Sequence, residues 1–165
     1  MITTPKIEHR PEQAYAAIRT AVPIPFGKYL APLWGEVNQW LAKKGINQTG
    51  AAIIKYLTTD MSTKLDIEVG FFFDGQLIGD ERVIVSSMTA GDYVTLLYTG
   101  PYRGKGIYKA TVALFEWTEK NPVNWDLKKQ DNVETWNNRF EIYLTDHAKE
   151  TDTKKYQTEL AFGIK

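Results

Sequence analysis

The chain has 165 residues, 43% of them hydrophobic and 24% charged, which is enough apolar material for one globular domain with a continuous core. Its 20 basic and 20 acidic side chains cancel, so no long-range field draws it to nucleic acid or to an anionic membrane surface. The absence of cysteine excludes disulfides and thiolate chemistry. Because no leader segment or long apolar run is present, we expect a soluble cytoplasmic protein without membrane contact.

The first half of the sequence predicts a strand, a helix and two further strands. Residues 13–20 alternate as a strand does, and residues 52–57 and 64–74 are rich in β-branched and aromatic side chains. Between them, apolar residues recur at the three- and four-residue steps of a helix, namely Leu30, Leu33, Trp34, Val37 and Leu41. Pro32 suits the first turn of this helix, and Gly45 suits the cap after its last turn.

The second half repeats this order, with a strand at 92–99, a helix at 107–120, an irregular polar span through Asn138, and strands at 139–145 and 157–164. Three pairs of landmarks lie roughly 73 to 78 residues apart: Tyr15 and Tyr93, Trp40 and Trp117, Glu68 and Glu141. Chance pairing is the alternative to duplication. We predict a single α+β domain over residues 1–165, built from two tandem β-α-β-β modules at roughly 5–80 and 81–165. They form one antiparallel sheet with both helices on one face and a ligand cleft on the other.

The strand RFEIYLT, residues 139–145, carries a carboxylate among apolar neighbours. Such a charge must be solvated, paired or used, because removing its water is costly. If Phe140 and Ile142 lie under the helices, Glu141 and Tyr143 point to the opposite face. The matching strand of the first module is expected to add Glu68 and Phe72 there. Since small-molecule sites gather at concave junctions, we expect a cleft on this face where the modules meet.

Glu141 admits a functional and a structural interpretation. A buried carboxylate ringed by Tyr and Trp would bind a ligand cation while the rings supply cation–π attraction. It could also act as a general base toward water if burial raises its pKa. The structural alternative is a salt bridge to Arg19 or Arg139, or exposure on an open sheet face.

Several aromatic residues are candidates for the walls of this site. Tyr98 and Tyr102 flank Gly100-Pro101 in the strand-to-helix turn, where a phenol offers both a ring face and a hydroxyl, although they could instead cap the end of the sheet. The wider pool comprises Trp125, Trp136, Tyr143 and Tyr156, whereas Trp117 on the second helix is expected in the core. We predict no metal or cofactor: GPYRGKG lacks the spacing of a phosphate loop, and the two histidines have no zinc-ligand pattern.

Three segments resemble the GyrI-like small-molecule-binding proteins, whose fold also forms the effector-binding domain of AraC-type and MerR-type drug-sensing regulators. They are MTAGDYVTLLYTGPYRG, RFEIYLTD and KKYQTELAFGIK, and the likeness extends over nearly the whole chain. The resemblance implies two β-α-β-β copies in one antiparallel sheet. It also implies that Glu141 lies at the base of an aromatic cleft that recognises cationic or amphipathic aromatic compounds. His147 and Tyr156 depart from the usual proline and tryptophan, which puts ligand preference in question.

The first hypothesis for function is therefore a binder of hydrophobic, aromatic or cationic small molecules, with a role in xenobiotic recognition and detoxification. The second, implied by some stand-alone relatives, is a hydrolase that opens cyclopropane-bearing genotoxic alkylators, with Glu141 as general base and Tyr98 or Tyr102 steadying the substrate. The third is a protein that protects DNA gyrase or binds a regulator, although no residue marks a protein interface. Because the first strand is expected close to the N-terminus, we expect a free-standing domain without a helix-turn-helix.

Overall fold

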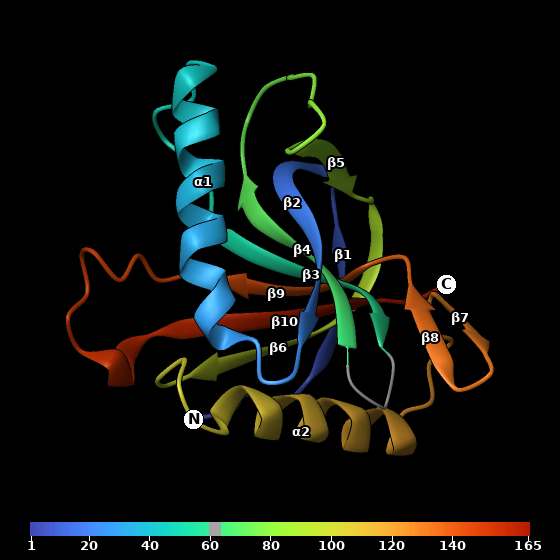
Figure 1. The fold of residues 1–165 in the computed structure, drawn as a ribbon. Coiled ribbons are helices and arrows are strands. Elements are labelled where there is room, and N and C mark those ends of the chain that lie inside the picture. The colour runs from blue at the N-terminus through green and yellow to red at the C-terminus, as the bar shows by residue number, and fades with distance from the viewer. Residues whose placement is uncertain (60–63) are drawn as a thin grey trace.

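The computed structural model describes residues 1–59 and 64–165 and has the predicted α+β architecture, with an antiparallel sheet and, within these ranges, two α-helices (Figure 1). The helices are α1 (Leu30–Lys43) and α2 (Gly106–Lys120), with short 3-10 helices η1 (Gly27–Tyr29) and η2 (Thr153–Lys155). The strands are β1 (Lys6–Arg10), β2 (Gln13–Pro23), β3 (Ala52–Thr59), β4 (Lys64–Phe72), β5 (Ile84–Met88), β6 (Gly91–Thr99), β7 (Leu127–Gln130), β8 (Val133–Trp136), β9 (Arg139–Tyr143) and β10 (Gln157–Gly163).

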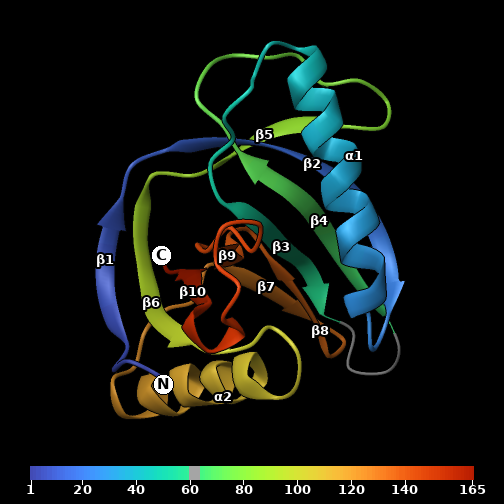
Figure 2. The same cartoon turned by 90° about the vertical axis from the view of Figure 1, so that its left-hand side faces the viewer.

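The strand–helix–strand–strand order occurs twice, as β2-α1-β3-β4 and as β6-α2-β9-β10. The main path of the sheet is β1-β6-β10-β9-β3-β4-β2-β5. The two groups therefore meet where β9 and β3 pair antiparallel, with Ile53 opposite Ile142 and Ile54 opposite Glu141. Figure 2 follows this path along the curve of the sheet, from β1 round to β2 and β5.

The sheet curls strongly, so its two faces have different neighbours. On the concave face, Tyr15 of β2 and Tyr93 of β6 belong to one buried cluster although their strands are not adjacent. On the convex face, Val37 of α1 packs with Ile18 of β2, and Leu114 of α2 packs with Leu96 of β6. The prediction that both helices cover one face is confirmed.

Helix α1 forms where the apolar stripe predicts it. Val37 and Leu41 are fully buried, and Leu33, Trp34 and Trp40 are partly buried at the margins of the stripe. Gly45 follows the helix with a φ of 89°, a left-handed conformation that glycine adopts without a Cβ penalty. Within the described residues, no helix combines the length and the apolar character needed to cross a membrane.

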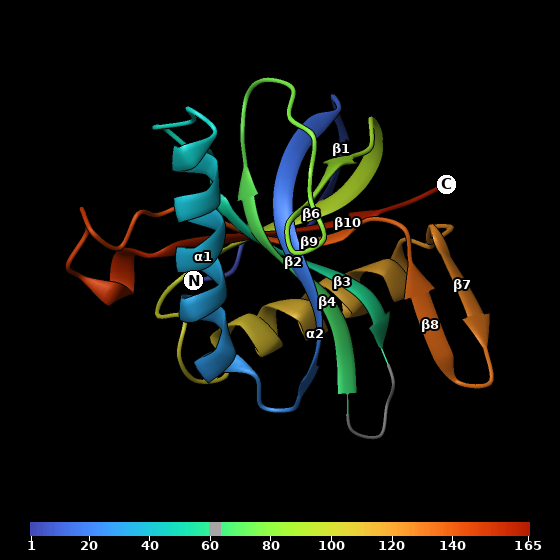
Figure 3. The ribbon, with the colours of Figure 1, turned by 45° about the horizontal axis from the view of Figure 1, so that its top comes forward.

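Four strands were not predicted from the sequence. Strands β1 and β5 lie at the two edges of the main path, and the span predicted to be irregular contains the β7–β8 hairpin (Figure 3). At its turn, Asp131 and Asn132 have φ values of 51° and 67°, the left-handed pair that a tight hairpin turn requires. The polar strand β7 shows no clear apolar alternation, so only this Asp-Asn pair marked the hairpin in the sequence.

Candidate functional site

Glu141 lies in the middle of an apolar row that crosses the convex face from strand to strand. The row, given by the pairing register, is Leu96, Leu160, Glu141, Ile54, Val69 and Ile18. Every other member is aliphatic, and Glu141 itself is only 7% exposed. The carboxylate is therefore embedded in an apolar surface at the junction of β9 and β3.

The predicted orientation of β9 is wrong. Arg139, Glu141 and Tyr143 point to the convex face, where Tyr143 shares a cluster with residues of α1 and α2, while Phe140 and Ile142 belong to the concave cluster. Both faces of β9 are buried, so strand alternation separated the two sets of side chains but did not show which set meets the helices. A cleft on the face away from the helices would not contain Glu141.

Two buried phenols satisfy the carboxylate. The Tyr56 hydroxyl donates to Glu141 Oε2 at 2.8 Å, and the Tyr143 hydroxyl donates to Oε1 at 2.7 Å. Burial raises the pKa of Glu141, while the hydrogen bonds from Tyr143 and Tyr56 and the positive charge of Arg139 act to lower it. Burial, and secondarily the Glu141 charge, raises the pKa values of Tyr56 and Tyr143 well above their ordinary range, so both hydroxyls stay protonated donors.

Half-buried aromatic rings surround these phenols. Trp34 of α1 and Tyr102 of the β6–α2 turn each meet the Tyr143 ring edge-on at 5.1 Å. Tyr102 also lies 4.7 Å from Tyr156. We call this group the Glu141 cluster and define it as Glu141 with Phe26, Leu30, Trp34, Tyr56, Tyr102, Ile107, Tyr143 and Tyr156. The cluster joins the N-terminal ends of both helices to the centre of the sheet.

The guanidinium of Arg139 lies in an aromatic cage beside the cluster. Its central carbon is 5.2 Å from the Tyr56 ring centroid, 5.0 Å from Trp136 and 4.5 Å from Phe162, with Phe115 on a further side. Among the described residues no carboxylate forms an ion pair with Arg139, and its Nε has no hydrogen-bond partner. Burial lowers the pKa of Arg139, and its electrostatic interactions with Tyr56, Glu141 and Glu134 act to raise that pKa.

Glu68 and Phe72 lie on the face away from the helices, as predicted, but this separates them from Glu141, which faces the helices. Glu68 is on β4 between Lys55 and Arg19 in the register, faces the concave side and accepts a hydrogen bond from Tyr15. Phe72 packs against the same concave cluster. Glu68 is on the second strand after its helix, whereas Glu141 is on the first strand of the main path after α2. Because the β7–β8 hairpin is inserted between α2 and β9, Glu141 lies about as far after α2 in the sequence as Glu68 lies after α1, and the two glutamates look equivalent.

Tyr98, Trp125 and Trp136, which were predicted to line the site, lie outside the Glu141 cluster. The Tyr98 hydroxyl donates to the carbonyl oxygen of Pro101 at 3.0 Å, and its ring fills the space beneath the β6–α2 turn, as the capping alternative described. This contact braces the turn that carries Tyr102. Trp125 and Trp136 lie 5.5 Å apart in the cluster beneath α2.

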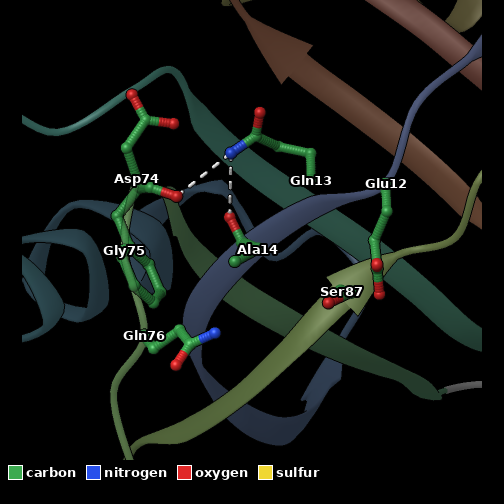
Figure 4. Close-up of a pocket in the computed structure, with 8 residues that line it drawn as sticks. Glu12, Gln13, Ala14, Asp74, Gly75, Gln76 and Ser87 are labelled. Atoms are coloured by element: carbon green, nitrogen blue, oxygen red, sulfur yellow. Dashed lines mark hydrogen bonds between the residues drawn. The ribbon is translucent and has the colours of Figure 1, made fainter.

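Two cavities lie elsewhere on the molecule. The first, of about 390 Å³, is shown in Figure 4 and is lined by Glu12, Gln13, Ala14, Phe73, Asp74, Gly75, Gln76 and Ser87. The second, of about 360 Å³, is lined by Phe115, Thr118, Glu119, Pro122, Val123 and Trp125. Neither of these two is lined by Glu141, whose carboxylate is covered by neighbouring side chains. In the part of the chain that the structure describes, no three His, Asp or Glu side chains are grouped to hold a metal ion.

Sequence reasoning missed Tyr56, Trp34 and Phe26. Tyr56 was assigned only to a strand and Trp34 only to a helix stripe, because an aromatic residue in a core stripe looks the same whether or not it borders a site. The sequence carried no signal for Tyr56, because only the β3–β9 register puts Ile54 opposite Glu141 and so brings Tyr56, two residues after Ile54, to the same face. Trp34 carries a polar N–H, which here donates to the carbonyl oxygen of Ile53 at 3.2 Å.

Comparison with solved structures supports the fold. The EcmrR C-terminal domain superposes with a TM-score of 0.71 at 19% identity, covering 98% of this chain and 96% of that one. In the EcmrR–DNA complex the score is 0.77 at 21% identity, covering 99% of this chain but only 57% of the EcmrR chain, so this chain spans just over half of it. SAV2435 bound to tetraphenylphosphonium gives 0.60 at 12% identity, covering 99% and 94% of the two chains.

A hydrolase from Listeria innocua gives a TM-score of 0.61 at 12% identity, covering 98% of this chain and 92% of that one. Comparison with curated proteins gave no match. Residues 3–165 match the family model described as the GyrI-like small molecule binding domain. The chain therefore belongs to the GyrI-like small-molecule-binding domain family.

Proposed function

We propose that this domain binds hydrophobic aromatic small molecules that carry a positive charge, xenobiotic cations among them, with Glu141 as the polar anchor. The observation that carries the proposal is a buried carboxylate set in an aliphatic row and hydrogen-bonded only by phenols among the described residues. A carboxylate in such a place favours any cation that can reach it, because its own solvation is poor.

The two phenols do not use all the lone pairs of the Glu141 carboxylate. An ionised carboxylate offers about four lone-pair sites, and one hydroxyl engages each oxygen. A cation can therefore approach Glu141 while Tyr56 and Tyr143 hold its orientation. The rings of Trp34 and Tyr102 would add cation–π and stacking attraction to a flat aromatic ligand.

The surface next to the cluster suggests where a ligand enters. Four exposed apolar side chains lie within two residues of a cluster residue in the chain: Ile24 at 57%, Tyr29 at 37%, Tyr108 at 68% and Leu144 at 47%. A contiguous patch of exposed apolar residues often marks a binding site, and we propose that these four side chains form one. We propose that a ligand enters here, between the N-terminal ends of α1 and α2, by displacing the rings of Trp34 and Tyr102 that cover Tyr143.

Calorimetric titration with tetraphenylphosphonium, the ligand named for SAV2435, tests the proposal. Glu141→Gln is expected to weaken binding by about 30-fold to 1,000-fold, the effect of removing one partner of a buried charge pair. Glu68→Gln is the matched control, since Glu68 is also buried and bonded to a tyrosine but faces the concave side. Equal binding by Glu141→Gln, or no binding of this or other lipophilic cations by the wild type, would contradict the proposal.

A second candidate is the hydrolysis of cyclopropane-bearing alkylators, favoured by the raised pKa of Glu141 and by the fold shared with the Listeria innocua hydrolase. Glu141 would take a proton from water as the water oxygen bonds to a ring carbon. The strained carbon–carbon bond would break, and the proton would pass to the carbon released. Tyr56 and Tyr143 are better placed to assist than Tyr98 and Tyr102, whose hydroxyls donate to backbone carbonyls.

Mass spectrometry of such an alkylator after incubation tests this second candidate. Wild-type protein should add the mass of one water faster than buffer does, and Glu141→Gln should not. Turnover by the wild type at the buffer rate would exclude the hydrolase and leave the binding proposal standing.

A further inference from the structure

Arg139 and Glu141 are linked through one tyrosine. They lie two residues apart on β9 and point to the same face of the sheet. The ring of Tyr56 lies 5.2 Å from the Arg139 guanidinium, while its hydroxyl donates to Glu141. A positive charge is thus held close to the carboxylate, but by aromatic faces and not by an ion pair with any described residue.

We propose that Arg139 is the resident counter-charge of the Glu141 carboxylate and sets the charge of the ligands that this site accepts, favouring one positive charge over two. This inference rests on the proposed function of the Glu141 cluster. With Arg139 in place, the pair is neutral before a ligand arrives. A monocation that contacts Glu141 leaves one positive charge in excess, whereas a dication leaves two in a poorly solvated region.

The aromatic cage explains why Arg139 can fill this role without blocking Glu141. A guanidinium is weakly hydrated and stacks on rings, so four aromatic faces can hold it. An ammonium, which is more strongly hydrated, would lose more on entering the same cage. Because no ion pair joins it to Glu141, both carboxylate oxygens remain bonded to phenols and directed at the cluster. The charge of Arg139 acts on the site through space.

The groups that could titrate around this pair are few. Among the described residues, Glu141 is faced by Tyr56 of β3, by Tyr143 and Arg139 of β9, and by Tyr102 of the β6–α2 turn behind Tyr143. Arg139 also interacts electrostatically with Glu134 on β8. The neighbouring residues of α1, α2 and β10 in this region, Leu30, Ile107 and Leu160, do not titrate. A pH dependence of binding in the acidic range is therefore assigned to Glu141 if Glu141→Gln abolishes it, and to Glu134 if it persists in that variant.

Charge selectivity in variants at position 139 tests the proposal. Arg139→Met keeps an apolar side chain of similar length in the cage, and Arg139→Lys keeps the charge; thermal unfolding verifies that each variant is folded. The probes are tetraphenylphosphonium, a bis(triphenylphosphonium) dication and neutral triphenylphosphine oxide. The dication should gain about tenfold or more relative to the monocation in Arg139→Met. The neutral probe should be unaffected, and Arg139→Lys, which keeps the charge but suits the cage less well, should stay closer to the wild type than Arg139→Met does. An unchanged dication-to-monocation ratio in Arg139→Met overturns the proposal.

A second measurement needs no ligand. Carbon NMR titration of the Glu141 carboxyl should give a higher midpoint in Arg139→Met than in wild type or Arg139→Lys, because the neighbouring positive charge is gone. Identical midpoints overturn the proposal even if binding is observed. If the midpoint rises but the wild type binds none of the probes, Arg139 is still the counter-charge of Glu141, and it is the proposed binding function that fails.

Discussion

Removing one of the two hydroxyls that reach Glu141 should destabilise the fold in a pH-dependent way. Tyr56→Phe and Tyr143→Phe keep the ring packing and delete one donor each, from hydrogen bonds of 2.8 and 2.7 Å. Hydrogen bonds to charged groups contribute about 1.5–3 kcal/mol, and both lie in a buried region. Each variant should therefore lose about 1.5–3 kcal/mol of unfolding free energy where Glu141 is ionised.

The sign of the pH dependence follows from what the hydroxyls do to Glu141. Burial raises the pKa of Glu141, and the two hydrogen bonds oppose that rise by favouring the ionised form. Deleting one of them raises the pKa further, so the folded variant binds a proton more readily than wild type does. The deficit in stability is then largest above the folded pKa of Glu141 and shrinks as the pH falls through it.

Urea unfolding at about pH 7 and about pH 4 measures this difference. Tyr98→Phe is the control, because its hydroxyl donates to the neutral Pro101 carbonyl and should contribute only about 0.5–1.5 kcal/mol, equally at both pH values. The reasoning is refuted if Tyr143→Phe and Tyr56→Phe show the same loss at both pH values, or no more loss than Tyr98→Phe at neutral pH.

Two further predictions concern stability. Glu141→Gln should melt at a higher temperature than wild type at neutral pH. Because burial raises the pKa of Glu141, the wild type loses stability as this carboxyl ionises, and glutamine avoids that loss. The difference in melting temperature should therefore close as the pH falls below the ordinary pKa of a glutamate. Thermal unfolding across this pH range checks it, and a constant gap would contradict it. Gly106→Ala should lose about 1–3 kcal/mol of unfolding free energy in urea, because its Cβ would meet the Tyr98 ring. Gly27→Ala, whose Cβ meets open space, should lose less. Equal losses in the two variants would count against the bracing role of Tyr98.

Local pattern predicted the elements that have one clear periodicity. The stripe ending at Leu41 identified α1, and β-branched runs identified β3 and β4. The charged edge strand β1 and the polar strand β7 carry no such pattern, since they are held by pairing to neighbours that lie far away in the sequence or across a tight turn.

The site was predictable only in part, for the same reason. Glu141 could be identified because a carboxylate in an apolar strand needs an explanation. Its partner Tyr56 lies 85 residues away and is brought to it by the β3–β9 register, which no local pattern encodes. The same register decides that Glu141 faces the helices and that Glu68 does not.

A crystal structure of the domain with tetraphenylphosphonium is the most direct test of the proposed binding site. The account predicts the phosphonium centre beside the Glu141 carboxylate, with Tyr56 and Tyr143 still donating to it and the rings of Trp34 and Tyr102 moved aside. A cation seated instead in the cavity near Ser87 or on the concave face near Glu68, with Glu141 still covered, would contradict it.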